Sequence, residues 1–391
     1  MKAKPIYLYA VFVLTIAVVC CKKPYAPSIV SSNSSYLVVE GVINAGSDST
    51  IIKLSRTVKL SDSVNHAPEL GARITVESDQ GATYRLAELK SGVYVTTGLN
   101  LDNSHKYRLH ITTATGKEYL SDYEAVKPTP AIDSVGYTVQ ANGIQLYVNS
   151  HDPNNNTRYY RWNYQETWNF HAKYPAAFIT DGKQLKYRTP DQQVFSCFTG
   201  EASSMIILGS TKALSQDVVY QQPLTQIAST SEKIEARYSI LVKEYALSSA
   251  AYNFWQNLKK NTEQMGSIFD AQPSEIPGNI HCVTTPSELV VGYVSVSTLQ
   301  QKRIFISQAE LPQTWVTTYP YQCELDSLLF CHGPACNQND VAVFLLPLDA
   351  KEFAITPISI PGGQGLIGYL SADSQCADCT IRGTTKIPSF W

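Results

Sequence analysis

The sequence predicts a mainly β protein, with an N-terminal antiparallel sandwich of immunoglobulin-like or prealbumin-like type followed by a second β-rich domain with one amphipathic helix. Three observations support this fold class. Short segments of alternating apolar and polar residues recur from Tyr36 onwards, turn-forming residues separate them, and one stretch has helical spacing. The chain of 391 residues is long enough for more than one hydrophobic core.

Residues 36–126 form the first predicted domain, the β-sandwich. In one of its segments Tyr107, Leu109 and Ile111 alternate with polar residues, which is typical of a half-buried strand. About seven such strands in about 90 residues favour a sandwich. The domain ends at the paired prolines of residues 127–130, because proline cannot join a β ladder.

Residues 127–391 form the second predicted domain, which is β-rich and ends in a cysteine-rich segment. A helix is expected over about residues 247–265, where apolar residues recur at three- and four-residue steps. Ser248 and Ser249 precede the helical pattern as caps, and Gly266 follows it.

One strand of this domain, expected over residues 157–168, has an aromatic face and a polar face. Arg161, Asn163 and Gln165 alternate with the aromatic residues. Exposed aromatic side chains stack on sugars and anchor protein partners, so this face is either packed sandwich core or a partly exposed recognition surface for a glycan or peptide. The recognition surface would consist of Tyr160, Trp162, Tyr164 and Trp168.

Residues 1–20 have the layout of a secretory signal peptide. Lys2 and Lys4 precede an uncharged apolar run from Ile6 to Val19. This run is shorter than the roughly 20 apolar residues that a transmembrane helix needs. The sequence therefore predicts export rather than a membrane span.

A cysteine after this run is the predicted site of lipid attachment. Lipoprotein signal peptidase requires an aliphatic residue at the third position before the cysteine and a small residue directly before it. Cys21 meets both requirements, with Val18 and Cys20 at those positions, whereas the alternative Cys20 directly follows the larger Val19. Residues 21–35 would be the lipidated cysteine and a flexible tether, and the several acyl chains of a bacterial lipoprotein would hold the protein at a membrane.

The other cysteines are candidates for disulfide bonds, the usual state of cysteine outside the cytoplasm. They are Cys197, Cys282, Cys323, Cys331, Cys336, Cys376 and Cys379. Their odd number leaves at least one thiol unpaired. Structural zinc would need two closely spaced pairs, and only the last two cysteines form one, so disulfides are favoured and no metal ion is predicted.

The sequence predicts no catalytic residue and no cofactor. It contains neither G-x-S-x-G nor H-E-x-x-H. The glycines of residues 363–368 have dinucleotide-loop spacing but precede no helical pattern. Asp152 begins a run similar to a calcium loop but lacking its glycine and its glutamate. Glu166 has no identifiable partner for glycoside hydrolysis. The net charge of −2, with no basic stripe, argues against nucleic-acid binding.

Several strings are similar to those of one known family. They are YLVVEG, GARITVES, RYYRWNYQETW, YSILVKEYALS, NLKKNTEQMGSIFDAQPSEIPGNI, KRIFIS and CADCTIRGTTKIPSFW. Together they resemble the domain of unknown function 4249 family of Bacteroidetes lipoproteins over nearly the whole mature chain. The resemblance implies a lipoprotein of the outer membrane or periplasm, often encoded beside a TonB-dependent receptor. Lys22 and Lys23 stand where surface-exported lipoproteins of that phylum often carry acidic residues, so the membrane face is left open.

These observations lead us to expect a non-catalytic, lipid-anchored protein of the cell envelope, at the outer membrane. We expect it to be accessory to a TonB-dependent outer-membrane receptor in ligand or nutrient capture. One alternative is a carbohydrate-active or other extracytoplasmic enzyme. Another is a structural or assembly factor of the outer membrane.

Overall fold

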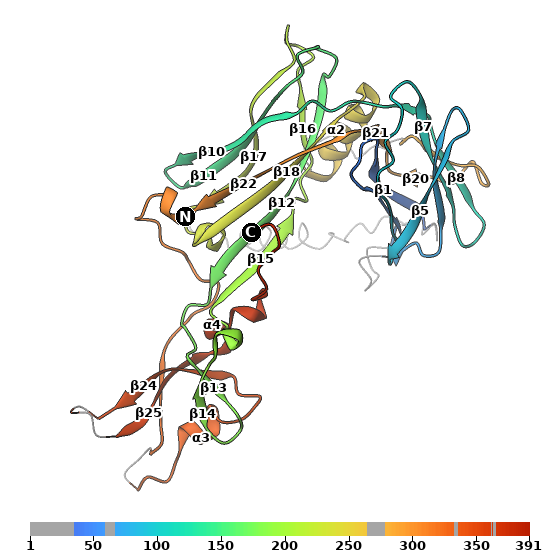
Figure 1. Cartoon of the computed structure of the whole chain (residues 1–391). Coiled ribbons are helices and arrows are strands. Elements are labelled where there is room, and N and C mark those ends of the chain that lie inside the picture. The colour runs from blue at the N-terminus through green and yellow to red at the C-terminus, as the bar shows by residue number, and fades with distance from the viewer. Residues whose placement is uncertain (1–34, 59–66, 264–277, 332–334, 361, 363–364) are drawn as a thin grey trace, which may run out of the picture.

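The computed structural model describes residues 35–58, 67–263, 278–331, 335–360, 362 and 365–391. The described residues fold into an N-terminal sandwich, a middle sandwich and a distal lobe (Figure 1). Strands dominate all three lobes, so the predicted fold class is confirmed. The predicted signal peptide, the lipid-attachment residue Cys21 with its alternative Cys20, and the tether up to residue 34 lie outside the described residues.

The N-terminal sandwich consists, within the described residues, of one 12-stranded sheet that turns back on itself. Strand β5 joins its two halves, because it pairs with β4 on one side and β6 on the other. Tyr107, Leu109 and Ile111 point into the core, as their alternation predicts. The strands are β1 (Leu37–Asn44), β2 (Thr50–Arg56), β3 (Ala67–Pro68), β4 (Arg73–Ser78), β5 (Thr83–Lys90), β6 (Val93–Thr96), β7 (Lys106–Thr112), β8 (Glu118–Ser121), β9 (Glu124–Ala125), β19 (Ile280–Cys282), β20 (Val290–Val291) and β21 (Ser295–Ser297).

The last three of these strands come from a distant part of the chain, so the first domain is not the continuous segment 36–126 that the sequence predicts. Strands β20 and β21 pair in parallel with β1, and β19 pairs with β8. Val294 and Val296 fill the core of the N-terminal sandwich. Parallel neighbours require a long connection, and here the chain between β1 and β20 includes β2–β9 and all strands of the middle sandwich except β22.

The middle sandwich packs two antiparallel sheets face to face. The β12 sheet has the order β15-β12-β18-β22, with β16 also paired to β12, and the β10 sheet has the order β10-β11-β17. The core between them is rich in aromatic and β-branched residues. The strands are β10 (Ile132–Gln140), β11 (Gly143–His151), β12 (Tyr159–His171), β15 (Ser196–Ala202), β16 (Ile207–Ser210), β17 (Val218–Ala228), β18 (Arg237–Ala246) and β22 (Leu299–Ser307).

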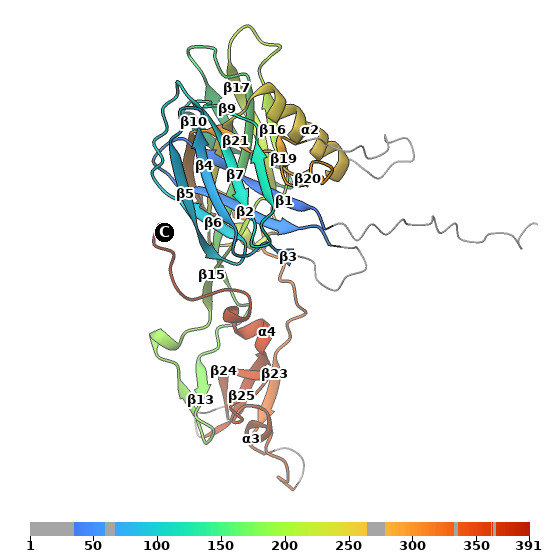
Figure 2. The same ribbon diagram turned by 90° about the vertical axis from the view of Figure 1, so that its right-hand side faces the viewer.

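The distal lobe lies beyond the ends of β12 and β15, away from both sandwiches (Figure 2). It combines a segment from the middle of the chain with a segment near the C-terminus. Its elements are β13 (Phe178–Thr180), β14 (Leu185–Tyr187), β23 (Asp326–Leu329), β24 (Glu352–Ser359), β25 (Leu366–Asp373), α3 (Asp340–Phe344) and α4 (Ser374–Ala377). Four short 3-10 helices complete the described structure, namely η1 (Pro190–Gln192), η2 (Glu232–Ile234), η3 (Gln308–Glu310) and η4 (Cys379–Ile381).

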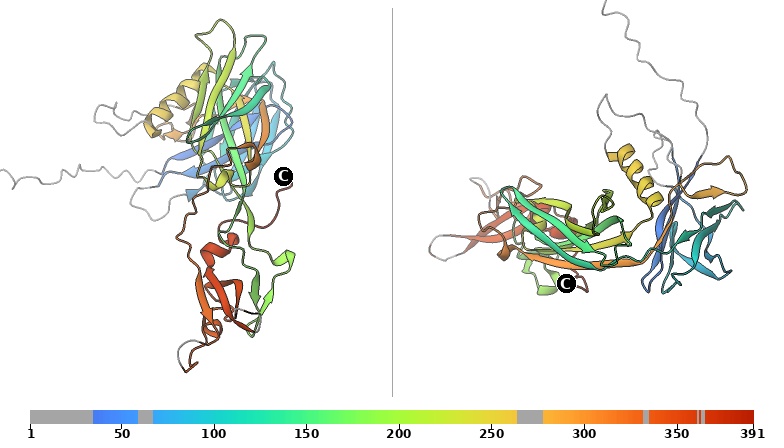
Figure 3. Two further views of the ribbon diagram at one scale, coloured as in Figure 1. Left: turned by 90° about the vertical axis from the view of Figure 1, so that its left-hand side faces the viewer. Right: turned by 90° about the horizontal axis from the view of Figure 1, so that it is seen from above.

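Helix α2 (Ser249–Glu263) lies at the junction of the two sandwiches (Figure 3). It confirms the predicted helix as far as residue 263, the last described residue of that segment. Ala251 and Phe254 are its buried residues, and the Phe254 ring contacts Tyr293 of the N-terminal sandwich with centroids 5.4 Å apart. No helix of the described residues is both long and apolar enough to cross a membrane.

Candidate functional site

The aromatic face of β12 is the inner face of the β12 sheet and belongs to the core. Tyr160 and Trp162 are 0% exposed and stack with centroids 5.5 Å apart, while Tyr164 and Trp168 are 4% and 7% exposed. The interpretation of these four residues as a recognition surface is therefore wrong. They face the β10 sheet, and burying such large rings stabilises the sandwich more than leaving them in water.

Glu166 lies on the same inner face and has a partner carboxylate, Glu201, directly opposite it on β15. Lys233 forms ion pairs with both carboxylates, at 2.9 Å to Glu166, and the Tyr238 hydroxyl donates to Glu166 at 2.7 Å. The hydrogen bond from Lys233 lowers the pKa of Glu201. Glu166 is 4% exposed, so its carboxylate is a buried member of this lysine-bridged cluster rather than an open group on the surface.

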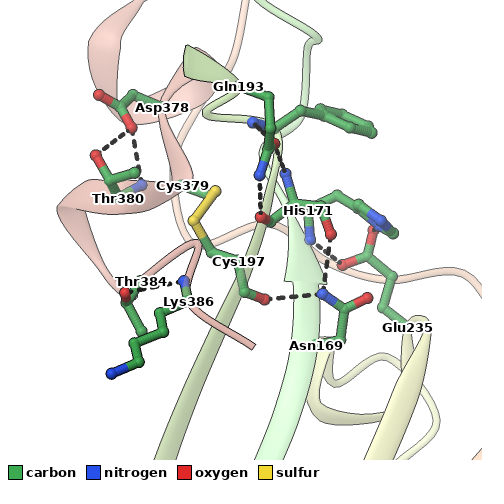
Figure 4. The surroundings of a disulfide bond; sticks show 12 residues. Asn169, His171, Gln193, Cys197, Glu235, Asp378, Cys379, Thr380, Thr384 and Lys386 are labelled. Atoms are coloured by element: carbon green, nitrogen blue, oxygen red, sulfur yellow. Dashed lines mark hydrogen bonds and ion pairs between the residues drawn. A yellow bond between two sulfur atoms is a disulfide. The ribbon is translucent and has the colours of Figure 1, made fainter. Parts of the chain in front are cut away.

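The C-terminal cysteines form disulfide bonds, as predicted. Cys197 of β15 pairs with Cys379, with Cα atoms 5.7 Å apart (Figure 4). Cys323 pairs with Cys376, and Cys331 with Cys336. Of the predicted candidates Cys282 alone stays a free thiol among the described cysteines, buried in the core of the N-terminal sandwich. The first two bonds fasten the C-terminal segment to the middle sandwich and the distal lobe, whereas the third joins two cysteines only five residues apart.

The run from Asp152 that is similar to a calcium loop is a turn. The Asp152 carboxylate accepts hydrogen bonds from the backbone N–H groups of Asn154, Asn156 and Thr157, each at 2.9 Å. It therefore holds its own turn together. Of the glycines with dinucleotide-loop spacing, Gly365 directly precedes β25, Gly368 lies within β25, and Gly363 lies outside the described residues, so a strand and not a helix follows Gly365. In the described part of the chain no histidine, cysteine and carboxylate side chains gather in a group suited to a metal ion.

A cleft lies between the N-terminal sandwich and the outer face of the β12 sheet. Two adjoining hollows of about 430 and 400 Å³ make up this interdomain cleft, and both are lined by Glu40, Arg161, Asn163 and Ser203. Ligand sites commonly occupy about 300–1,000 Å³ and occur between domains. The interdomain cleft is therefore the candidate functional site.

The apolar hollow of the cleft is walled by three elements. Helix α2 contributes Phe254, Trp255 and Leu258, β1 contributes Val39, and the loop after β15 contributes Met205. The guanidinium of Arg161 lies over the Trp255 ring, 3.9 Å from its centroid. Stacking of this kind orients the planar guanidinium and leaves its edge, which carries the N–H donors, free for a ligand.

The outer face of the β12 sheet is cationic. Cross-strand register places Arg161 opposite Tyr245 and Lys243 opposite Asn163. Counting every residue that the described strands of this sheet place on the outer face, there is no aspartate or glutamate, whereas the basic residues are Arg161, Arg237, Lys243 and Arg303. Two of these, Arg161 and Lys243, line the interdomain cleft.

Burial lowers the pKa of both cleft cations. For Arg161, Tyr245 and Glu40 offset the desolvation only in part. For Lys243, desolvation lowers the pKa, the charge of Asp48 raises it in part, and the charge of Arg303 lowers it further. Among the described residues, neither Arg161 nor Lys243 has a hydrogen-bond or ion-pair partner. A partly buried cation without a close anion is costly, and a bound anion removes that cost.

Two neighbouring segments of the chain connect the two sandwiches on either side of the cleft. Residues 127–131 lead into the middle sandwich, and residues 297–299 run from β21 into β22. The Thr129 N–H donates to the Thr298 hydroxyl at 2.8 Å, and the Ala246 N–H donates to the Thr129 hydroxyl at 3.0 Å. The cleft is therefore built into the fold rather than formed across one free linker.

Sequence reasoning separates the two faces of β12 but does not identify Arg161 or Lys243 as site residues. The available signal was the arginine on the polar face of a strand that is aromatic on its other face. No sequence pattern shows that Glu40 and Trp255 lie across the cleft from Arg161, because both are far from it in sequence.

The fold and the cleft define a protein of two β-sandwiches with a disulfide-stapled distal lobe. The chain belongs to the family described as Domain of unknown function (DUF4249), whose model matches residues 22–303. The resemblance to this family noted from the sequence is thus confirmed over residues 22–303. A comparison with curated proteins found no match.

Two solved structures are similar to this chain only at a low level. One is a segment of two fibronectin type-III domains from chicken tenascin, at 12% identity, covering 54% of this chain and 90% of that chain with a TM-score of 0.17. Another is chitinase ChiA74 from Bacillus thuringiensis, at 11% identity, covering 52% of this chain and 30% of that chain with a TM-score of 0.15. These TM-scores are too low to support an argument about function.

Proposed function

We propose that the protein is a non-catalytic lipoprotein of the cell envelope that captures a small ligand and accompanies a TonB-dependent outer-membrane receptor. The observation that carries the capture role is the interdomain cleft. There the partly buried cations Arg161 and Lys243 lie next to apolar walls, between two sandwiches joined by two chain segments. In this proposal the cleft binds its ligand and carries out no reaction on it.

The lipid anchor and the receptor partner have separate support. The apolar N-terminal run before Cys21 supports lipidation. Three disulfides support an oxidising compartment. The receptor is proposed from the gene neighbourhoods that the family resemblance implies. The burial of Tyr160 and Trp162 removes the main support for a glycan ligand.

Affinity capture tests the receptor role. The tagged, lipidated full chain is purified from detergent-solubilised outer membrane, and co-purified proteins are identified by mass spectrometry. We expect a β-barrel receptor in the wild-type sample and its loss with the Cys21→Ser variant, which cannot be acylated. Recovery of lipidated protein from the outer membrane without any receptor would show that this role is wrong.

Mass spectrometry of the mature N-terminus tests the anchor. We expect an acylated Cys21 as the first residue. An acylated Cys20 would support the alternative cleavage site, and an unmodified N-terminus would contradict lipidation.

The enzyme and assembly-factor alternatives make different predictions. An enzyme would hydrolyse members of a glycan panel and lose that activity in Glu166→Ala. An assembly factor would affect membrane integrity rather than nutrient uptake when its gene is deleted. No contact within the described residues favours either over ligand capture.

A further inference from the structure

We infer that the interdomain cleft binds a small organic carboxylate with an apolar body, and that Arg161 receives the carboxylate group. This inference rests on the capture role proposed above and names the ligand class of the same cleft. It follows from the orientation of Arg161, from the charges around it, and from the apolar walls next to it.

The guanidinium of Arg161 is positioned for a planar acceptor. Its face lies on the Trp255 ring at 3.9 Å, and the Tyr245 ring lies 5.7 Å from it on the neighbouring strand. These two contacts fix the plane of the group without using its N–H donors. A carboxylate accepts two parallel hydrogen bonds from such an edge, which is the preferred geometry of arginine with planar anions.

Lys243 places a second positive charge near the same point. Arg161 and Lys243 are diagonal neighbours on antiparallel strands, with their backbones roughly 7–8 Å apart. Lys53 also lines the cleft from the opposite wall. Glu40 and Asp48 are the acidic residues that act on these cations. The excess of positive charge is therefore small, which suits one carboxylate better than a polyanion.

The hollow beside Arg161 determines the rest of the ligand. Phe254 and Leu258 of α2 and Ile206 of the loop after β15 line it with hydrocarbon. The loop is tied to the helix, because Glu263 accepts from the Ile206 N–H at 2.7 Å and Lys259 donates to the Ile206 carbonyl at 2.7 Å. A ligand with its carboxylate at Arg161 would bury an aliphatic or aromatic body here, with favourable transfer from water.

Calorimetry with paired probes tests this inference. The probes are phenylbutyrate and its amide, which have the same shape and differ in charge. They are titrated into the purified full chain, with the heat of partition into empty micelles subtracted. We expect the wild type to bind the carboxylate about tenfold or more tightly than the amide, since one charge-assisted hydrogen bond contributes on the order of a factor of ten.

Variants assign the preference to the cleft. Arg161→Gln should abolish the preference for the carboxylate and leave amide binding nearly unchanged, and Lys243→Gln should reduce the preference several-fold. The matched control is Arg237→Gln, because Arg237 lies on the same sheet face and also stacks on an aromatic ring, Phe305, at 4.4 Å, but does not line the cleft. It should leave both affinities unchanged.

Several results would overturn the inference. These are equal affinity of the wild type for the two probes, no binding of the carboxylate at millimolar concentration, or a preference that survives in Arg161→Gln. If circular dichroism shows that Arg161→Gln is unfolded, the inference is tested by the affinities of the wild type and of Lys243→Gln for the two probes. A carboxylate preference without receptor recovery would contradict only the accessory role, and receptor recovery without the preference would contradict only the ligand class.

Discussion

The two faces of the β12 sheet differ in how their polar groups are satisfied. On the inner face the Trp162 indole N–H donates to Glu244 at 2.6 Å, and the Tyr160 hydroxyl donates to Asp217 at 2.5 Å. On the outer face Arg161 and Lys243 are partly buried without a hydrogen-bonded acceptor among the described residues. Strands β12 and β18 thus supply the paired groups of Trp162 and Glu244 to the core and the open cations Arg161 and Lys243 to the cleft. The Trp168 indole N–H is an exception on the inner face, because it has no acceptor among the described residues.

This difference indicates a division of roles along β12. Buried polar groups that are fully paired fix one packing arrangement and contribute to stability. Desolvated groups left open reduce stability and are typical of binding sites. Inner-face substitutions should therefore affect the free energy of unfolding, and outer-face substitutions within the cleft should affect ligand affinity.

The largest expected effect comes from the inner face. Trp162→Ala removes a fully buried ring and leaves the Glu244 carboxylate without its indole donor. We expect a loss of about 3–5 kcal/mol in the free energy of unfolding, measured by urea titration. The comparison is Arg161→Gln, the next residue on the same strand, which should change stability by less than about 1 kcal/mol. Equal losses would remove the distinction between the faces.

The disulfide of the inner face should have the next largest effect. Cys197 and Cys379 both belong to the core of the middle sandwich, and their bond joins residues 182 apart in sequence. Replacing both with alanine should cost about 2–5 kcal/mol, measured by thermal unfolding. Cys282→Ala, which removes a buried free thiol, is the control and should cost less.

Glu244 should make the stability of the core depend on pH. Burial raises its pKa from 4.5 to about 7, although Trp162 and Ser150 donate hydrogen bonds to it. Because the folded pKa lies above the unfolded one, this stabilising contribution is complete below about pH 4.5 and is lost as the pH rises to about 7. The loss should be at most about 3 kcal/mol.

The variant Glu244→Gln tests this pH dependence. The amide keeps an acceptor for Trp162 and gains a donor for Ser150, so the variant should be the more stable protein at pH 8. Urea titrations at several pH values measure the difference. The same pH slope in both proteins would show that Glu244 is not its source.

The smallest expected effect comes from the outer face. Lys243→Met keeps an unbranched side chain one atom shorter and removes the charge of an ammonium group whose pKa is lowered by burial. The variant should have unchanged or slightly higher stability, by up to about 1 kcal/mol, measured by thermal unfolding. A clear decrease would mean that Lys243 is a structural cation rather than an open one.

Part of this arrangement is predictable from the sequence. The alternation of Tyr160, Trp162 and Tyr164 with polar residues predicts the strand and its two faces, and the spacing from Leu247 predicts the helix. Alternation does not state which face meets the core. The second sheet decides that, because it covers the aromatic face.

The remaining features depend on contacts between distant segments. Strands β19 to β21 have two or three residues each, too few to show a period, and they belong to the N-terminal sandwich only because β1 and β8 have free edges there. The cysteine pairs are likewise set by the fold. The cleft joins Glu40, Arg161 and Trp255, which no local pattern connects.

The most direct test of the division between the faces is a crystal structure of the protein with phenylbutyrate. The account predicts the carboxylate within hydrogen-bonding distance of the Arg161 guanidinium, with the phenyl ring against Phe254 and Leu258 and the inner face unchanged. A probe bound elsewhere, with Arg161 free of any anion, would contradict it.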